Sequence, residues 1–122
     1  MATNFKQEGE IVTWTNDTGQ AVVSGQVVRI GKVLGVALVD IASAADGSVA
    51  LEGGFTVPKV SGAVIAQGEN LTWDASAAAF DDNAASPASG DVTGPPAVAL
   101  EAAGNGVTEL LVKFTGVPGT VA

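Results

Sequence analysis

Paired carboxylates are the closest approach to a catalytic pattern in this sequence. Glu8 and Glu10 lie two residues apart, so on a strand their side chains would share one face, and Asp81 and Asp82 are adjacent. Glycosidase chemistry needs two carboxyl groups held at a fixed separation within a cleft. A solvated strand edge explains the first pair and a surface loop explains the second, so we expect neither pair to be catalytic.

Cation binding and nucleophilic catalysis find equally little support. Asp81, Asp82, Asn83 and Asp91 could in principle bind Ca²⁺, but their spacing does not match an EF-hand loop. The chain has no Cys and no His, which excludes the usual zinc sites, thiolate chemistry and an imidazole base. No Gly-x-Ser-x-Gly elbow is present either. We therefore predict no catalytic residue, no metal and no cofactor, and the chain is not expected to be an enzyme.

Two tryptophans, Trp14 and Trp73, could serve as platforms for a sugar or a protein partner. In a domain this small, burial in the core or in an interface is the expected role of a tryptophan on a strand.

Charge restricts the possible partners. The formal net charge is -8, from 13 acidic and 5 basic residues, and the basic residues are scattered along the chain. Contact with nucleic acid or with an anionic membrane needs clustered Lys and Arg, so neither is expected. The start of the chain lacks the features of a signal peptide, and the most apolar stretch, 33–45, is too short to span a bilayer. We expect synthesis in the cytoplasm.

Short strands and tight turns are the elements that must position any site. Val is frequent, and Gly or Pro recurs about every 8–12 residues, which is typical of β-sandwiches and barrels. We predict an all-β fold, a small β-barrel or β-sandwich of short antiparallel strands. The predicted strands are 10–15, 26–30, 33–41, 48–52, 55–57, 71–74, 98–100 and 108–114, with turns at 16–19, 31–32, 46–47 and 105–106.

The predicted organisation has three parts. Residues 1–9 form an extended N-terminal arm, 10–116 a single β domain, and 117–122 a short, frayed C-terminal tail. Within the domain, 75–96 is rich in Ala, Ser, Gly and Pro and is expected to be a long surface loop with at most one helical turn.

The order of several short motifs carries more information than any one of them. Along the chain they are Ala2-Thr3-Asn4-Phe5 followed by Glu8-Gly9, the Gly-bounded strand 25–31, the Gly-Val-Ala segment 34–38, Gly53-Gly54-Phe55-Thr56-Val57-Pro58-Lys59, the segment 68–74 ending in Trp-Asp, and the block 98–103. This succession resembles the small capsid cement (decoration) proteins of tailed phages and prophages. The resemblance runs from residue 2 to about residue 114, and it departs from the expected pattern at 82–96.

The resemblance implies a structural virion protein that binds the outer surface of a phage capsid and stabilises the expanded head. Its partner would be the major capsid protein, it would be made in the cytoplasm of the bacterial host, and a homo-oligomer, with a trimer favoured, would be the working form. The residues expected at the capsid or subunit interface are Thr3, Asn4, Phe5, Trp14, Phe55, Pro58 and Lys59. Phe5 would anchor the arm on the shell, or else the arm would form a first strand of the domain's own sheet.

Two other functions remain open from the sequence. A tail- or fibre-associated phage β-domain would share the composition, and a carbohydrate-binding module would use the tryptophans.

Overall fold

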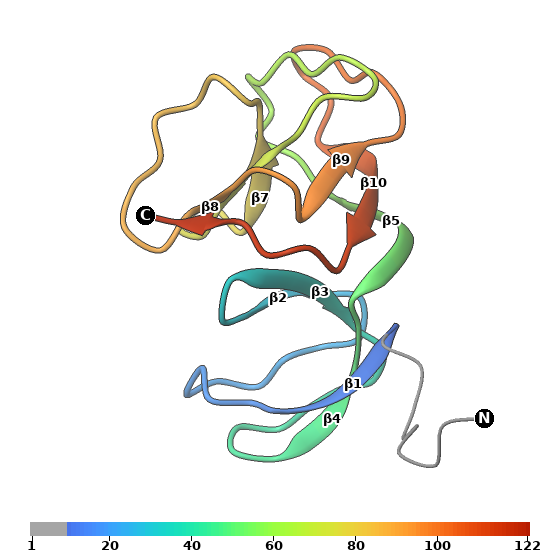
Figure 1. Ribbon diagram of the computed structural model, residues 1–122, viewed down its shortest axis with the longest axis vertical. Coiled ribbons are helices and arrows are strands. Elements are labelled where there is room, and N and C mark those ends of the chain that lie inside the picture. Colours follow the sequence, from blue (N-terminus) through green and yellow to red (C-terminus); the bar gives the residue numbers. More distant parts are fainter. Residues whose placement is uncertain (1–9) are drawn as a thin grey trace, which may run out of the picture.

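Frequent glycines and β-branched residues produce short strands throughout the part of the chain that the computed structural model describes, residues 10–122 (Figure 1). Within that range there is no helix, and so none with the length and hydropathy to cross a membrane. The predicted all-β class is confirmed. The strands are β1 (Ile11–Thr15), β2 (Val27–Ile30), β3 (Val33–Ala37), β4 (Asp46–Ala50), β5 (Glu52–Pro58), β6 (Thr72–Asp74), β7 (Ala79–Asp81), β8 (Val92–Thr93), β9 (Ala97–Ala99), β10 (Glu109–Thr115) and β11 (Thr120–Val121).

The N-terminal lobe, residues 10–51, is one curled four-stranded sheet with the order β1-β4-β3-β2 (Figure 1). All its neighbouring strands are antiparallel. Its core contains Trp14, Val22, Ile41 and Val49, all buried. Alternation along β1 explains this placement, because Trp14 points inward while Thr13 and Thr15 are exposed.

The β2–β3 hairpin is buried on both faces. Ile30 pairs with Val33, so Gly31 and Lys32 form the predicted two-residue turn. Gly31 has φ 60° and Lys32 has no positive φ, as a type II′ turn requires. One face of the hairpin adds side chains to the core of the C-terminal lobe, and the other packs in the N-terminal lobe.

The C-terminal lobe, residues 52–122, wraps two sheets around a second core. Their strand orders are β5-β10-β9 and β11-β8-β6-β7. Two single-residue bridges connect the sheets, Lys59 with Phe80 and Asn70 with Val98, so the strands enclose their core as in a small barrel. Phe80 lies at the centre of that core, with its ring 4.9 Å from Trp73 and 5.9 Å from Phe114 in edge-to-face contacts.

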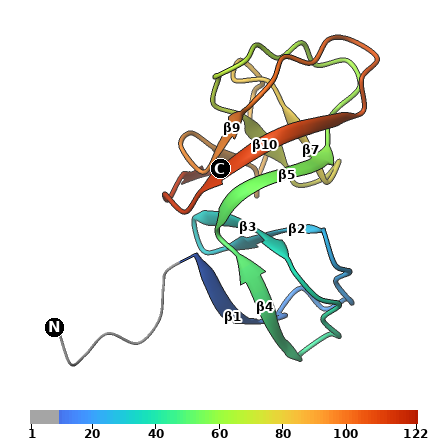
Figure 2. The ribbon, with the colours of Figure 1, turned by 90° about the vertical axis from the view of Figure 1, so that its right-hand side faces the viewer.

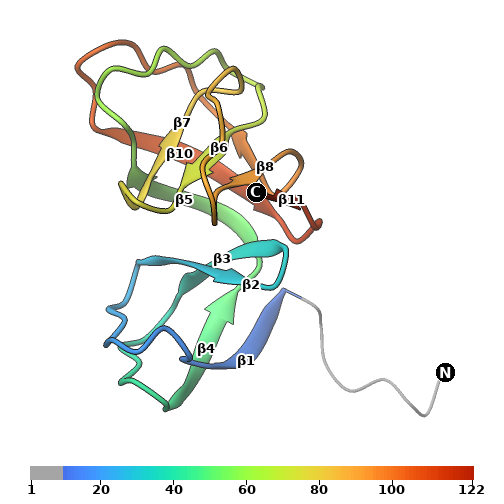
Figure 3. The ribbon, with the colours of Figure 1, turned by 90° about the vertical axis from the view of Figure 1, so that its left-hand side faces the viewer.

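The two lobes share apolar packing and are joined by the chain at β5 (Figure 2). Val27, Leu34 and Val36 of the N-terminal lobe belong to the C-terminal core. In addition, the Gly119 N–H donates to the Lys32 carbonyl at 2.8 Å. The segment that leads into β11 therefore reaches back to the β2–β3 turn (Figure 3).

Three local predictions were wrong. Asp46 and Gly47 begin β4 instead of forming a turn; the chain reverses just before them, where Ala44 has φ 66°. The segment 75–96 contains β7 and β8, with no helical turn, and only the stretch between those strands is a loop. The tail is not frayed, because β11 pairs with β8.

Candidate functional site

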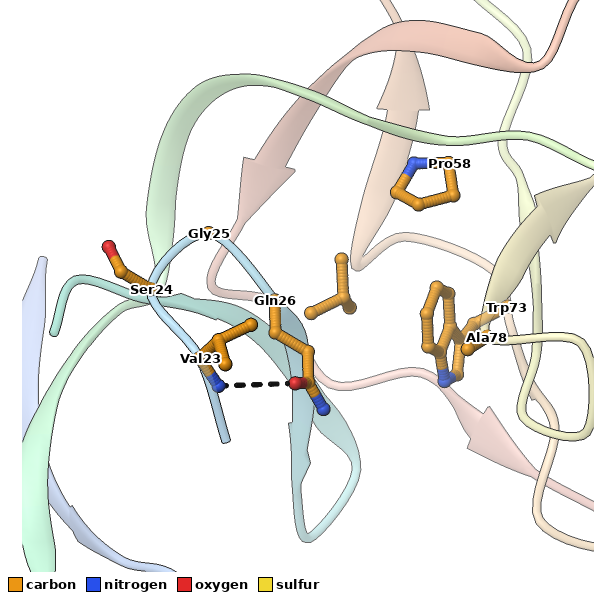
Figure 4. Close-up of a pocket in the computed structure, with 8 residues that line it drawn as sticks. Val23, Ser24, Gly25, Gln26, Pro58, Trp73 and Ala78 are labelled. Atoms are coloured by element: carbon orange, nitrogen blue, oxygen red, sulfur yellow. Dashed lines mark hydrogen bonds between the residues drawn. The ribbon is translucent and has the colours of Figure 1, made fainter. Parts of the chain in front are cut away.

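An apolar cavity of about 370 Å³ lies between the two lobes (Figure 4). The loop before β2 forms one wall, and the end of β5, β6 and the β6–β7 turn form the other. The Trp73 indole and the Pro58 ring lie across the cavity from Val23 and Gln26 (Figure 4). The lining residues are Val23, Ser24, Gly25, Gln26, Val27, Pro58, Trp73 and Ala78.

Hydrogen bonds fix the wall contributed by the N-terminal lobe. The Gly25 N–H donates to the Ala37 carbonyl at 2.7 Å, and the Ser24 N–H donates to the Asp40 carboxylate at 2.8 Å. The Ser24 hydroxyl is directed to a backbone carbonyl of the same lobe. The lining contains no titratable side chain, so the cavity can receive an apolar group but offers no acid, base or activated nucleophile.

The residues predicted for an interface lie in different places. Thr3, Asn4 and Phe5 fall outside the described residues. Trp14 is 8% exposed and belongs to the N-terminal core. Phe55 is half-buried, with its ring 5.9 Å from that of Phe114.

Pro58 and Lys59 are neighbours with opposite environments. Pro58 is exposed and lines the cavity, whereas Lys59 is only 3% exposed. Strand alternation explains the difference, since successive side chains point to opposite faces. Lys59 and Trp14 therefore support the surface from beneath, and direct contact with another protein requires other side chains.

The ammonium group of Lys59 is held entirely by backbone carbonyls. It donates to Val60 at 2.8 Å, Val107 at 3.0 Å, Gly104 at 3.1 Å and Ser61 at 3.4 Å. A buried charge is tolerated only when it is hydrogen-bonded, and here the acceptors come from two loops far apart in the sequence.

The carboxylates considered for catalysis or Ca²⁺ binding hold turns instead. Asp81 and Asp82 each accept a backbone N–H from a residue that follows them. Both carboxylate oxygens of the buried Asp91 accept backbone N–H groups, from Ala75 at 3.0 Å and Ala88 at 2.9 Å. Glu8 lies outside the described residues. Within the described part of the chain, no cluster of acidic side chains is arranged to hold a metal ion.

Asp74 shows a clear electrostatic effect. The Ser76 hydroxyl donates to its carboxylate at 2.8 Å, and the Ala77 and Ser76 N–H groups add further bonds. These bonds hold the pKa of Asp74 below its ordinary value of 3.8, against the smaller opposing effect of burial. The motif is a local turn and does not face the cavity lining.

Sequence reasoning missed two exposed apolar side chains at the far end of the C-terminal lobe. Val64 is 65% exposed and Val107 is 43% exposed. Neither follows a strand or helix period, so periodicity gives no signal. Each lies in a Gly-containing stretch without any charged residue, and that lack of charge in an acidic chain is the feature that could have marked them.

A small all-β scaffold with an apolar cavity, and with no catalytic or metal-binding cluster among residues 10–122, is typical of a structural or binding protein. The family model of the phage cement protein matches residues 6–114. The chain therefore belongs to the phage cement protein family, as the ordered motifs predicted. No curated protein matches the chain.

Membership in this family assigns a structural, capsid-stabilising role in the virion. The chain binds the capsid and is located there. Nothing in the described structure favours a tail- or fibre-associated domain or a carbohydrate-binding module, and both tryptophans are buried.

Proposed function

We propose that this chain binds the outer surface of the expanded phage head through contacts with the major capsid protein and acts by binding alone, without catalysis. The observation that carries the proposal is the match to the phage cement protein family over residues 6–114. The apolar cavity without titratable lining residues supports a binding role over a catalytic one. Synthesis in the cytoplasm of the bacterial host is part of the proposal.

The proposed organisation is an N-terminal arm at 1–9 followed by a single β domain over 10–116. The shared packing of the two lobes supports one domain, because side chains of the β2–β3 hairpin complete the C-terminal core. Phe5 would anchor the arm, and Pro58 beside the cavity would extend the contact on the domain itself.

We further propose a homo-oligomer, with a trimer favoured, as the form that occupies the shell. Several weak contacts to a repeating lattice reinforce one another when the subunits are linked, so no single contact has to be strong.

Co-sedimentation with capsid shells tests the proposal. Purified protein is mixed with expanded shells that lack it and, as the control, with unexpanded shells. We expect saturable binding to expanded shells only, with a copy number that reflects the symmetry position. Equal binding to both shells would contradict the preference for the expanded head, and binding to neither would contradict the proposed function.

A variant lacking residues 2–9 tests the arm separately. We expect it to bind expanded shells more weakly than the full chain while its circular dichroism spectrum and thermal midpoint stay the same. Unchanged binding would remove the arm from the proposed interface.

A further inference from the structure

Two loops form the end of the C-terminal lobe that lies farthest from the N-terminal lobe (Figures 1 and 2). We call them the distal loops, residues 60–66 and 102–108. They lie side by side, because Ile65 and Ala103 exchange both backbone hydrogen bonds and the Gly106 N–H donates to the Ser61 carbonyl at 2.6 Å. The two loops therefore present a single surface.

The buried Lys59 ammonium fixes the distal loops relative to one another. Two of its carbonyl acceptors lie in the first loop and two in the second. A buried ammonium group loses its hydration, and no carboxylate is among its hydrogen-bond partners in the described structure. Its clearest effect is to hold four carbonyls in one arrangement, so the surface above it is formed before any partner arrives.

That surface is apolar at its centre and charged only at its edge. Val64 has the largest exposed fraction among the large apolar side chains of the described chain, and Val107 lies in the neighbouring loop. The distal loops contain no acidic residue, although the chain has 13. Glu101 and Glu109, both exposed, come immediately before and after the second loop. An uncharged centre with a polar rim is typical of protein–protein contacts.

We propose that the distal loops are a preformed docking surface for the capsid lattice, with Val64 and Val107 as its apolar contacts. This inference rests on the proposed function. A rigid surface loses little conformational freedom on binding, so even a small apolar contact contributes to affinity.

A second copy of the chain fits this surface less well than the capsid does. In a symmetric contact between two copies the same patch would meet itself, bringing Glu101 and Glu109 of each copy close to those of the other. Like charges brought together in this way disfavour association, and each copy carries a formal net charge of -8.

The test uses the full chain with Val64→Asp and Val107→Asp combined. Both side chains are exposed, so the fold should survive, and unchanged circular dichroism and thermal midpoint would verify it. Val39→Asp is the matched control, since Val39 is 46% exposed but lies in the N-terminal lobe. We expect the double variant to bind expanded shells at least about tenfold more weakly than wild type, and the control to bind normally.

The outcomes separate this inference from the proposed function. Wild-type binding together with undiminished binding of the double variant would overturn the inference alone. Wild-type protein that binds neither shell would overturn the proposed function and the inference with it. Sedimentation velocity adds a third readout: loss of self-association in the double variant with retained capsid binding would make the distal loops a subunit interface and overturn their assignment to the capsid.

Discussion

Replacing Lys59 with methionine removes one buried ammonium group while keeping an unbranched side chain of similar length. In the native chain this group donates to the carbonyls of Val60, Ser61, Gly104 and Val107. Three of those carbonyls also accept a backbone N–H, so within the described residues only the Val107 carbonyl loses its sole donor. The variant therefore loosens the second distal loop more than the first.

The expected loss of stability follows from two opposing effects. A hydrogen bond to a charged group contributes about 1.5–3 kcal/mol, and three of the four bonds are 3.1 Å or shorter. Burying an ammonium group costs several kcal/mol of hydration, which the methionine variant avoids. We expect the free energy of unfolding to fall by about 2–4 kcal/mol, because the carbonyls lose charged donors that methionine cannot replace.

Urea denaturation followed by tryptophan fluorescence measures this change, and hydrogen exchange locates it. The amides of Gly106 and Val107 should exchange at least about tenfold faster in Lys59→Met, beyond any change in β1–β4. Lys113→Met is the control: Lys113 is exposed on β10, and its replacement should change stability by less than about 0.5 kcal/mol. A Lys59→Met variant as stable as wild type, with unchanged exchange in the distal loops, would refute the role assigned to the buried cation.

Two further predictions concern local packing and charge. Gly47→Ala places a methyl group 2.4 Å from Cγ1 of Ile41 and should lower the free energy of unfolding by about 1–3 kcal/mol, whereas Gly62→Ala, with nothing within 4 Å, should change it little; equal effects in denaturation would contradict the packing argument. Ser76→Ala removes the main cause of the lowered pKa of Asp74, so the Asp74 pKa measured by NMR should rise toward 3.8. Because the lowered pKa stabilises the fold above pH 3.8 and that contribution is lost as the pH falls, the variant should lose less stability on acidification; an unchanged Asp74 pKa would contradict this.

Local signals predicted the first half of the fold better than the second. Gly31 in a two-residue turn between Val-rich runs gave the β2–β3 hairpin correctly. The Asp46-Gly47 pair has equally strong turn chemistry, but the buried Ile41 side chain occupies the space beside Gly47, and only glycine fits there within β4. The glycine is explained by a tertiary contact, and a local rule cannot detect that contact.

Strands of two or three residues explain why the segment 75–96 was misread. β7 and β8 are too short to show alternation in the sequence. They are stabilised by partners elsewhere in the chain, as when Trp73 pairs with Phe80 and also with Val92. The same reason applies to the tail, where β11 depends on β8.

The candidate site was predictable only in part. The family resemblance pointed to a capsid-binding protein, and the family match confirms it. The burial of Lys59 was not predictable, because a lysine after a strand-ending proline ordinarily faces solvent. Its four acceptors come from loops that only the folded chain brings together.

Thermal rupture of packaged phage heads tests the central claim, that this chain stabilises the capsid, most directly. DNA-filled heads lacking the protein are saturated with it or left bare, and release of DNA is followed by a fluorescent dye as the temperature rises. Saturated heads should release their DNA at a higher temperature than bare heads, and heads mixed with the Val64→Asp, Val107→Asp double variant should behave more like bare heads. Saturated and bare heads that rupture at the same temperature would contradict the capsid-stabilising role.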